Sequence, residues 1–409
     1  MSLLVQKFGG SSVADITCIE RVADRVIATK EQGHQVVVVV SAMAGDTNKL
    51  VALAKQITED PDMREYDVLL SSGEMITIAL LSIMLNKKGY QARSYTANQI
   101  KILTDDVHKK AHVVAVETAR LLEDLTNGWI PVVAGFQGVN EKGDITTLGR
   151  GGSDATAVAL AAALNANECQ IYTDVDGVYT ADPRIVKEPR MLSKISYDEM
   201  LQMASLGAKV LQTQSVELAC QNNVPTRVKS TFTNNPGTLL CHHVERLKAT
   251  PVTGVVSKHD LARITLRNVP HYAGFVVKVL AVLTSRHISI DMMVQHQSED
   301  NQSALSIVVP RDEFVLAETL LTKFVEEQGL PSIIASQGVA KLSLVGHGLN
   351  SHAQVLHKMF EVLAAHQIDI FMLTCTEIKI SVIVNEELLE IGVEALHNAF
   401  ELSHEQSSH

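Results

Sequence analysis

The first 240 residues alternate short runs of β-branched and apolar residues with longer segments in which apolar residues recur at helical spacing. The short runs predict strands at Leu3–Phe8, Val36–Val40, Trp129–Ala134 and Gln170–Thr173. Between them, Ile16–Glu31 and Ala155–Leu164 predict helices, and the second is almost wholly small and apolar, which indicates a buried helix. Strands that alternate with helices are typical of a mainly parallel sheet sandwiched between helices. We therefore expect an α/β fold here.

A repeat begins after residues 241–250, a charged stretch that ends at Pro251 and predicts a linker. Ile288–Met292 (ISIDM) is echoed about 80 positions later by Ile368–Met372 (IDIFM). The flanking patterns predict strands at Ala262–Leu266 and Ala340–Val345, and helices at Val276–Ser285 and Gln354–Ala365. With a second strand pair and helix after each copy, the region predicts two βαββαβ units. We expect a domain at 1–240, a linker at 241–250, and two small units at 251–335 and 336–409, which bind a ligand or form an interface.

Composition narrows the class of protein. The 409 residues include 46% hydrophobic and 20% charged side chains, enough to build two or three cores. The net charge of −11 and the lack of a basic stripe with interleaved aromatic residues argue against a nucleic-acid partner. No run approaches the roughly 18 apolar residues of a spanning helix, and the N-terminus lacks a secretory pattern, so we expect no membrane segment.

Cysteine and histidine spacing does not favour a metal site. The five cysteines are far apart, without a CxxC pair or a Cys/His grouping at zinc spacing, which favours the reducing cytoplasm. His347, His352 and His357 follow one another every five residues, a spacing that walks around a helix instead of lining one face. We therefore expect no protein-held metal.

Three turns rich in Gly and Ser lie at predicted strand ends or ahead of a helix. They are Lys7–Ser12, Ser41–Asn48 and Leu148–Asp154. Glycine lets the backbone approach a phosphate closely, and a helix N-terminus supplies free N–H groups. None matches GxxxxGK[ST], which disfavours a P-loop fold. In open α/β sheets the carboxyl edge of the strands binds ligands, so we expect a phosphate site there.

Charged residues in and near these turns suit an amino acid and a nucleotide. Arg150 offers a planar fork for a carboxylate, and Asp154 lies where a helix begins, where it can also serve as an ordinary helix cap. Glu74 lies in an apolar helical segment, where an unpaired carboxylate is costly and calls for a cation such as a substrate ammonium. The segment Tyr172–Arg184 begins at a strand end and holds two tyrosines, three acids and an arginine, which suit a nucleotide, although Asp-Gly and Asp-Pro also form simple turns.

Taken together, these segments resemble the motifs of the aspartokinases, in the family's order and over nearly the whole chain. The matching segments are Lys7–Val13 (KFGGSSV), Ser41–Leu50 (SAMAGDTNKL), Ser72–Met75 (SGEM), Thr147–Ala157 (TLGRGGSDATA), Thr173–Arg184 (TDVDGVYTADPR) and Gly207–Leu211 (GAKVL). The paired C-terminal units resemble ACT domains. The resemblance implies the amino-acid-kinase fold and phosphorylation of the side-chain carboxylate of L-aspartate by ATP with Mg²⁺.

The resemblance also implies roles for single residues. Lys7 and Asp154 would form the catalytic pair. ATP would be bound by Lys7, Phe8, Gly9, Gly10, Ser41, Thr173, Asp174, Tyr179, Asp182, Arg184 and Lys209. Aspartate would be bound by Ser41, Thr47, Glu74, Arg150, Gly151, Gly152 and Ser153, with Glu74 on its ammonium and Arg150 on its α-carboxylate. Many relatives carry Arg where Gln214 stands.

A regulatory role for the C-terminal units follows from the same resemblance. Lysine or threonine would act as effector through Gly274, Ser289, Gln295, Asp369 and Ile370. The family's turn and its asparagines are altered here, with Ser289 and Asp369 in place of asparagine, so we expect weak or altered inhibition. The units would also assemble a cytoplasmic homo-oligomer. Two alternatives stay open: another amino-acid kinase of the same fold, and a catalytically silent amino-acid sensor.

Overall fold

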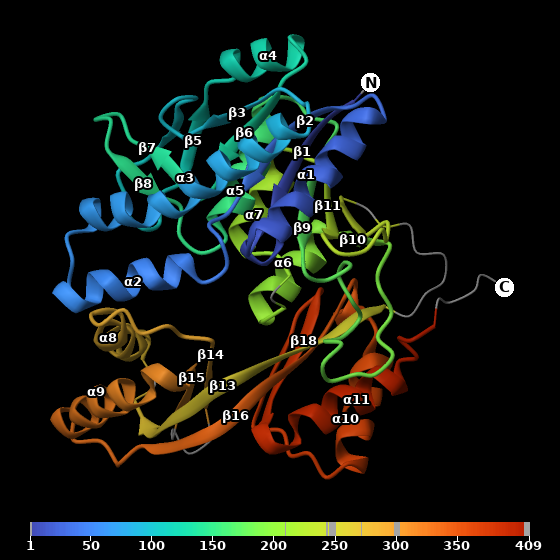
Figure 1. The fold of residues 1–409 in the computed structure, drawn as a ribbon. Helices are drawn as coiled ribbons and strands as arrows, with labels where there is room; N and C mark the ends of the chain where they lie inside the picture. The colour runs from blue at the N-terminus through green and yellow to red at the C-terminus, as the bar shows by residue number, and fades with distance from the viewer. Residues whose placement is uncertain are drawn as a thin grey trace. The chain divides into compact units, whose positions relative to one another are not determined.

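The computed structural model describes residues 2–208, 210–242, 244, 251–270, 272–297 and 303–404. The chain divides into two compact units (Figure 1). The first comprises Met1–Tyr179, Met191–Ser205 and Lys209–Arg246, and the second comprises Thr180–Arg190, Leu206–Ala208 and Leu247–His409. The predicted linker at 241–250 lies largely outside the described residues, and the predicted domain boundaries stay predictions.

The first unit is built on an eight-stranded sheet in the order β10-β12-β11-β9-β1-β2-β6-β3, with a four-stranded sheet in the order β5-β4-β7-β8. The strands are β1 (Leu3–Phe8), β2 (Gln35–Val40), β3 (Ala92–Tyr95), β4 (Ile102–Thr104), β5 (Val113–Val116), β6 (Ile130–Ala134), β7 (Gln137–Val139), β8 (Ile145–Thr147), β9 (Glu168–Thr173), β10 (Lys194–Ser196), β11 (Thr226–Ser230) and β12 (Thr238–Cys241). All neighbours in the large sheet pair in parallel except β11 and β12. The predicted α/β sandwich is therefore confirmed.

Helices cover both faces of the large sheet. They are α1 (Ile16–Glu31), α2 (Asp46–Ile57), α3 (Met63–Lys87), α4 (Ala119–Thr126), α5 (Gly152–Ala163), α6 (Tyr197–Leu206) and α7 (Thr213–Gln221), with a 3₁₀ turn η1 (Gly10–Val13). The apolar faces of α1 and α3 share one buried core with β2 and β6. Helix α5 packs against β1 and β9, and all its residues from Gly152 to Ala161 are buried. The predicted burial of this helix follows from its alanines, which allow close approach to the sheet.

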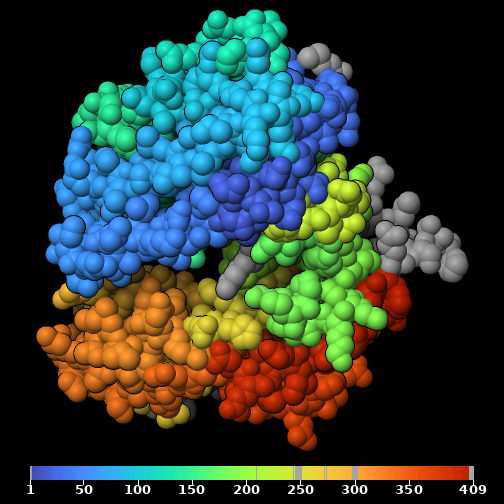
Figure 2. All heavy atoms as spheres, viewed as in Figure 1, coloured from blue at the N-terminus to red at the C-terminus, as the bar shows by residue number. Residues whose placement is uncertain are grey.

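Helix α3 is the longest helix described and carries a site residue. By length and composition alone it would be able to cross a membrane, but half of its most apolar window is buried inside the protein, where Ile78, Leu81 and Leu85 join the core. The side chain of Asp62 caps its start by accepting a hydrogen bond from the Glu65 N–H (3.1 Å). Figure 2 shows α2 and α3 in blue on the visible surface of the first unit. We interpret α3 as a core helix that also borders the site.

The second unit contains a six-stranded antiparallel sheet in the order β14-β15-β13-β16-β18-β17. Its strands are β13 (Val252–Val269), β14 (Met292–Gln297), β15 (Ser303–Pro310), β16 (Ile334–Gly346), β17 (Met372–Cys375) and β18 (Lys379–Asn385). Its helices are α8 (Ala273–Thr284), α9 (Phe314–Glu327), α10 (Ala353–Ala365) and α11 (Leu389–Ala399), with 3₁₀ turns η2 (Arg311–Glu313), η3 (Leu349–Ser351) and η4 (Glu386–Leu388). The repeat that the sequence predicts is therefore present as two similar halves.

The two central strands each run through both halves. In β13, residues 261–269 pair with β15, whereas residues 252–258 pair with the end of β16. Likewise, β16 pairs with β18 from Val339 onwards. The second half thus obtains its outer strand from residues 252–258, which the sequence pattern assigns to the unit at 251–335. An apolar cluster that includes Leu261, Val308, Val339 and Ile383 joins the halves.

Candidate active site

A cleft of about 340 Å³ opens in the first unit where the three glycine-rich turns meet. Two turns follow β1 and β2, which are parallel neighbours at the centre of the sheet, and the third leads into α5. The residues that line the cleft are Lys7, Gly10, Ser41, Ala42, Met43, Ala44, Gly45, Thr47, Glu74, Phe136, Gly149, Arg150, Gly151, Gly152, Ser153 and Asp154. The structure therefore brings together both residues proposed for catalysis and all seven proposed for aspartate.

Lys7 and Asp154 form a nearly buried ion pair in this cleft. The Lys7 ammonium lies 2.5 Å from the Asp154 carboxylate, and the two side chains are 11% and 9% exposed. Lys7 comes from β1 and Asp154 from the first turn of α5. Burying two charges is costly unless they pair. The pair therefore fixes an ammonium at a helix N-terminus, where the free N–H groups also favour an anion.

Gly151 forms the turn before α5 and cannot be replaced without strain. Its φ is +76°, in the left-handed region, and an added Cβ would collide with the side chain of Gln212. The same residue caps the helix, whose first turn carries Ser153 and Asp154. The helix begins three residues before the predicted Ala155, because this glycine permits the turn.

Glu74 is buried beside the turn after β2. One carboxylate oxygen accepts a hydrogen bond from the Ala42 N–H (2.9 Å), whereas the other oxygen, Oε2, is buried and has no hydrogen-bond partner among the described residues. Desolvation raises the pKa of Glu74 to about 7, against the opposing effect of the Ala42 hydrogen bond. A cation at this wall of the cleft would satisfy Oε2 and restore the carboxylate.

The close approach of α3 to this turn depends on Gly73. An added Cβ there would lie 2.8 Å from the Cβ of Ala42. Arg150 is exposed at the mouth of the cleft, and no hydrogen bond or ion pair joins its guanidinium to another described residue. The cleft thus presents a buried acid on one wall and an uncommitted guanidinium on another.

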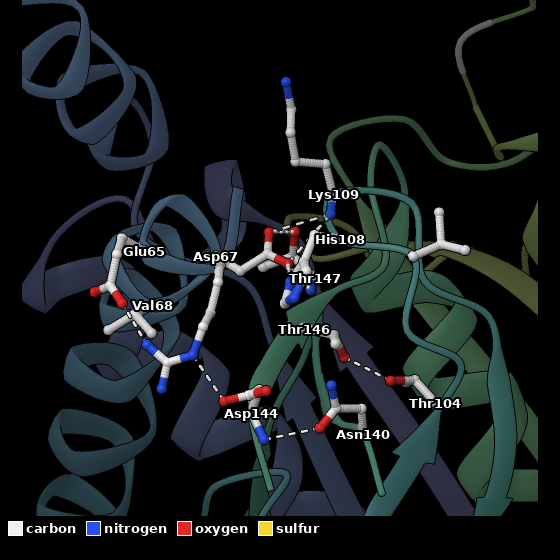
Figure 3. Close-up of polar contacts among 12 residues, drawn as sticks. Glu65, Asp67, Val68, Thr104, His108, Lys109, Asn140, Asp144, Thr146 and Thr147 are labelled. Carbon is white, nitrogen blue, oxygen red and sulfur yellow. Dashed lines mark hydrogen bonds and ion pairs between the residues drawn. The ribbon is translucent and has the colours of Figure 1, made fainter. Parts of the chain in front are cut away.

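The strand that precedes Arg150 is anchored by the buried side chain of Asp67 (Figure 3). Its carboxylate accepts hydrogen bonds from the hydroxyl of Thr147 (2.6 Å) and the N–H of Thr147 (3.1 Å). It also accepts one from the Lys109 N–H (3.2 Å) and lies 2.7 Å from His108 Nδ1. Because Thr147 ends β8, three residues before Arg150, Asp67 holds the start of the turn that carries the guanidinium.

Sequence reasoning missed Phe136, which lines the cleft with a φ of +67°. Its N–H donates to the Thr156 hydroxyl (3.1 Å), and its carbonyl accepts from the Leu148 N–H (2.9 Å). These two bonds hold the left-handed conformation, which is uncommon for an aromatic residue. An added Cβ on Gly152 would meet the Phe136 ring at 2.9 Å, so the ring packs directly on the turn. Only its place just after the strand Ile130–Ala134 hinted at a site.

The residues proposed for ATP are less uniformly placed. Thr173 and Asp174 follow β9 and bond to each other (3.1 Å), and Tyr179 bridges to Met191. The ring of Phe8 is buried and stacks on Tyr172 with centroids 4.7 Å apart, and its carbonyl accepts a hydrogen bond from the Ser41 N–H (3.1 Å). Gly9 donates to the Tyr172 carbonyl (3.2 Å).

The remaining nucleotide residues lie outside the first unit or outside the described residues. Asp182 and Arg184 pair with each other (2.6 Å) in the segment Thr180–Arg190 of the second unit. The side-chain hydrogen bond from Arg184 lowers the pKa of Asp182. Lys209 lies outside the described residues. All the assigned roles stay predictions.

The residues proposed for an effector lie in matching places of the two halves. Ser289 and Asp369 are both exposed, each just after a buried isoleucine, and Ile370 is partly buried. The Ser289 N–H donates to the Glu313 carboxylate (2.6 Å). Gln295 is exposed on β14, and Gly274 lies in the first turn of α8.

Comparison with known families matches two parts of the chain. Residues 2–230 match the amino acid kinase family, and residues 342–400 match an ACT domain. Among curated proteins, an aspartate kinase of Pseudomonas putida is 50% identical over 403 residues, covering 98% of both chains. Aspartokinase 2 of Bacillus subtilis is 44% identical over 408 residues and covers 100% of both.

Solved structures give the same result. Aspartokinase III of Escherichia coli in complex with aspartate and ADP, in its R-state, aligns with a TM-score of 0.79 at 28% identity and covers 97% of this chain and 99% of its own. The T-state of that protein, in complex with lysine and aspartate, aligns with a TM-score of 0.79 at 27% identity. The similarity extends through both units of the chain.

Proposed function

The chain belongs to the aspartokinases, the amino acid kinases that carry ACT domains, and from this premise we propose how its cleft binds and phosphorylates L-aspartate. The enzyme transfers the terminal phosphoryl group of ATP to the side-chain carboxylate of L-aspartate, giving 4-phospho-L-aspartate. The observation that carries our proposal is Oε2 of Glu74, which is buried in the wall of a cleft that also holds Arg150 and which no described residue hydrogen-bonds.

Aspartate is oriented by its three charged groups. Its ammonium pairs with Glu74, and its α-carboxylate with the fork of Arg150, which no other described residue engages. Ser153 and Thr47 add hydroxyl donors at the cleft wall. The side-chain carboxylate then points towards Lys7 and the N-terminus of α5. An α-amino acid with an acidic side chain satisfies all of these groups together.

The chemistry needs alignment and charge neutralisation. The attacking carboxylate is already ionised at neutral pH, so no general base is required. Lys7 neutralises charge on the transferring phosphoryl oxygens, and Asp154 holds the ammonium in place. Gly9, Gly10 and Ser41 offer backbone and hydroxyl donors to the phosphates. Transfer to an oxygen nucleophile depends mainly on such positioning and electrostatic stabilisation.

The cleft suits a Mg²⁺ ion that arrives with the nucleotide. The described residues contain no group of three or more His, Cys, Asp or Glu able to hold a metal ion. Mg²⁺ in kinases typically binds substrate phosphates, several waters and one or two carboxylates. Asp154 is the carboxylate beside the proposed phosphate position. When bound, the ion would neutralise phosphate charge.

The catalytic roles can be tested by removing each charge. We expect Lys7→Ala and Asp154→Ala to lower kcat about a thousandfold, because each removes or misplaces the cation on the transferring group. Formation of aspartyl hydroxamate from ATP, Mg²⁺, aspartate and hydroxylamine measures the rate. Lys142→Ala is the matched control, since this lysine is 71% exposed and pairs with Asp106. Near-normal kcat in either cleft variant would overturn the assignment.

Membership of the aspartokinases also suggests how the protein is regulated and where it acts. We propose that lysine or threonine acts on the ACT region, that the protein is a cytoplasmic homo-oligomer, and that Thr173, Asp174, Tyr179, Asp182, Arg184 and Lys209 contact ATP. The bound aspartate, ADP and lysine of the Escherichia coli enzyme support the ligand assignments. The identity of the effector rests on that similarity.

A further inference from the structure

An approximate two-fold symmetry relates the halves of the second unit and exchanges β13 with β16. The sequence RITL in β13 corresponds to KLSL in β16. The hydrogen bond between Thr265 and Ser306 (3.0 Å) has its counterpart between Ser343 and Ser381 (2.8 Å). The halves can therefore be compared position by position.

Where the central strands cross between halves, the matching positions carry different residues. The antiparallel register sets Lys258 opposite Lys341, and it sets Arg263 opposite Ser336. When the two-fold symmetry superimposes β16 on β13, Lys341 falls at the position of Arg263. In the same way, Lys258 falls at the position of Ser336. One cross-strand pair thus consists of two lysines, Lys258 and Lys341, whereas its symmetry counterpart consists of Arg263 and Ser336.

The two lysines form an ion cluster with Asp291. Asp291 precedes β14, and its side chain is 5% exposed. Its carboxylate lies 2.5 Å from the Lys341 ammonium and also pairs with Lys258. The aliphatic stem of Lys258 therefore reaches from β13 to a buried acid and occupies the space between them.

The counterpart of this cluster is partly empty. By the repeat, Phe371 corresponds to Asp291, and the Arg263 guanidinium lies 4.6 Å from its ring centroid. Ser336 is too short to fill the space that Lys258 fills in the other half. A cavity of about 270 Å³ results, lined by Ser336, Gln337, Gly338, Val339, Phe371, Asn385, Glu386 and Glu387. At roughly 30 Å³ per water in the liquid, this space suits a small molecule.

The charge of the lining favours a cation. Glu386 pairs with Arg311 and accepts a hydrogen bond from the Asp260 N–H (3.0 Å). No ion pair joins Glu387 to another described residue, and its side chain is exposed at the cavity. The ring of Phe371, over which the Arg263 guanidinium already lies, offers an apolar wall to an aliphatic chain. The amide oxygen of Gln337 can accept from a donor, whereas that of Asn385 already accepts a hydrogen bond from the Glu387 N–H (3.1 Å).

We propose that this cavity, which lies beside Ser336 where the other half carries Lys258, binds a small organic cation, a primary ammonium on an aliphatic chain. The ammonium lies towards Glu387, and the chain lies along Phe371 and Val339. The site is formed by residues of the second unit alone, so it does not depend on the proposed catalytic roles.

The test measures binding of 1,5-diaminopentane to the full chain without ATP or aspartate. Calorimetry should give one site per chain, and 1,5-pentanediol, a neutral molecule of similar shape, should not bind there. Ser336→Lys should weaken binding at least about tenfold, because the new side chain would occupy the cavity. Lys258→Ser should add a second site beside Asp291.

Ser351→Lys is the matched control, since it adds the same charge at an exposed serine outside the cavity. It should leave binding unchanged, and both lysine variants should keep kinase activity without the amine. The proposal fails if the diamine does not bind, if the diol binds equally well, or if Ser336→Lys binds like the original chain. Loss of kinase activity in the original chain would contradict the proposed function but not this site.

Discussion

The protonation state of Glu74 should depend on whether aspartate is bound in the cleft. Desolvation raises its pKa from 4.5 to about 7 in the folded protein. A group with a raised folded-state pKa stabilises the fold below its unfolded pKa, and this contribution is lost as pH rises through the folded value. The free energy of unfolding of the ligand-free enzyme should therefore fall by about 3 kcal/mol between pH 4.5 and pH 7 from this group.

Binding of aspartate should reverse that protonation. The substrate ammonium favours the carboxylate form of Glu74, so binding at pH 7 should release up to about half a proton. Titration calorimetry in buffers of different ionisation enthalpy measures this number. Glu74→Gln should abolish the release, flatten the pH dependence of stability, and raise the KM for aspartate far more than that for ATP. Unchanged proton release in this variant would remove Glu74 from the ammonium site.

Some residues of the cleft can be predicted from the sequence, and others cannot. Charge and glycine spacing marked the turns of Lys7, Asp154 and Arg150 and the buried acid Glu74, the resemblance to the aspartokinases supplied their roles, and the structure brings them into one cleft. Phe136 was not found, because its place after a strand is a weak signal and nothing in the sequence marks an aromatic residue with a left-handed backbone. Its conformation depends on hydrogen bonds to Leu148 and Thr156, which lie 12 and 20 positions further along the chain.

Helix α3 shows how an element positions the site. Alanine is more favourable than glycine in a helix by about 1 kcal/mol, yet Gly73 has no room for a Cβ beside Ala42. We expect Gly73→Ala to push the helix away from the turn after β2, break the bond from Ala42 to Glu74, and raise the KM for aspartate about tenfold. Steady-state kinetics would measure this effect.

Ser82→Ala is the control within the same helix, because its buried hydroxyl has no hydrogen-bond partner in the part of the chain that the structure describes and the change adds no atom. This variant should keep both KM values. If Gly73→Ala were more stable and had the original KM, the helix would not need its close approach.

The bounds of some helices and strands could be predicted from the sequence more completely than those of others. The predicted helix Ile16–Glu31 matches α1, since its apolar spacing and the Asp15 cap are local signals. The long strands β13 and β16 were predicted only in part, as Ala262–Leu266 and Ala340–Val345. Their extensions follow from pairing between residues far apart in the chain, and local pattern carries little information about such pairs.

At the scale of the whole molecule, we expect a homo-oligomer assembled at least partly through residues 251–409. Strands β14 and β17 are the edges of the six-stranded sheet and expose Met293 and Leu373. Unpaired edges with apolar residues favour association. Analytical ultracentrifugation should show that Met293→Glu shifts the full chain to smaller species, whereas Val114→Glu, at an exposed position in the first unit, should not. A monomeric original chain at micromolar concentration would contradict the prediction.

Feedback is expected to be weak or altered. Asp369 is exposed at one predicted effector position, and Ser289 at the other is held by the Glu313 carboxylate. A carboxylate near the effector's own carboxylate costs about 1 to 3 kcal/mol when desolvated, or about tenfold or more in affinity. Initial rates with millimolar lysine and threonine, alone and together, measure the effect. Asp369→Asn should strengthen inhibition, and strong inhibition of the original chain would refute the hypothesis.

The sharing of β13 and β16 makes the second half a circular permutation of the first. In the first half the outer strand, the start of β16, comes last in the chain, whereas the strand that plays this part in the second half, residues 252–258, comes before all its other elements. The second half therefore encloses the first as an insertion. This explains why the ACT match ends at residue 400, directly after α11. The strand that would complete a contiguous domain lies more than a hundred residues upstream.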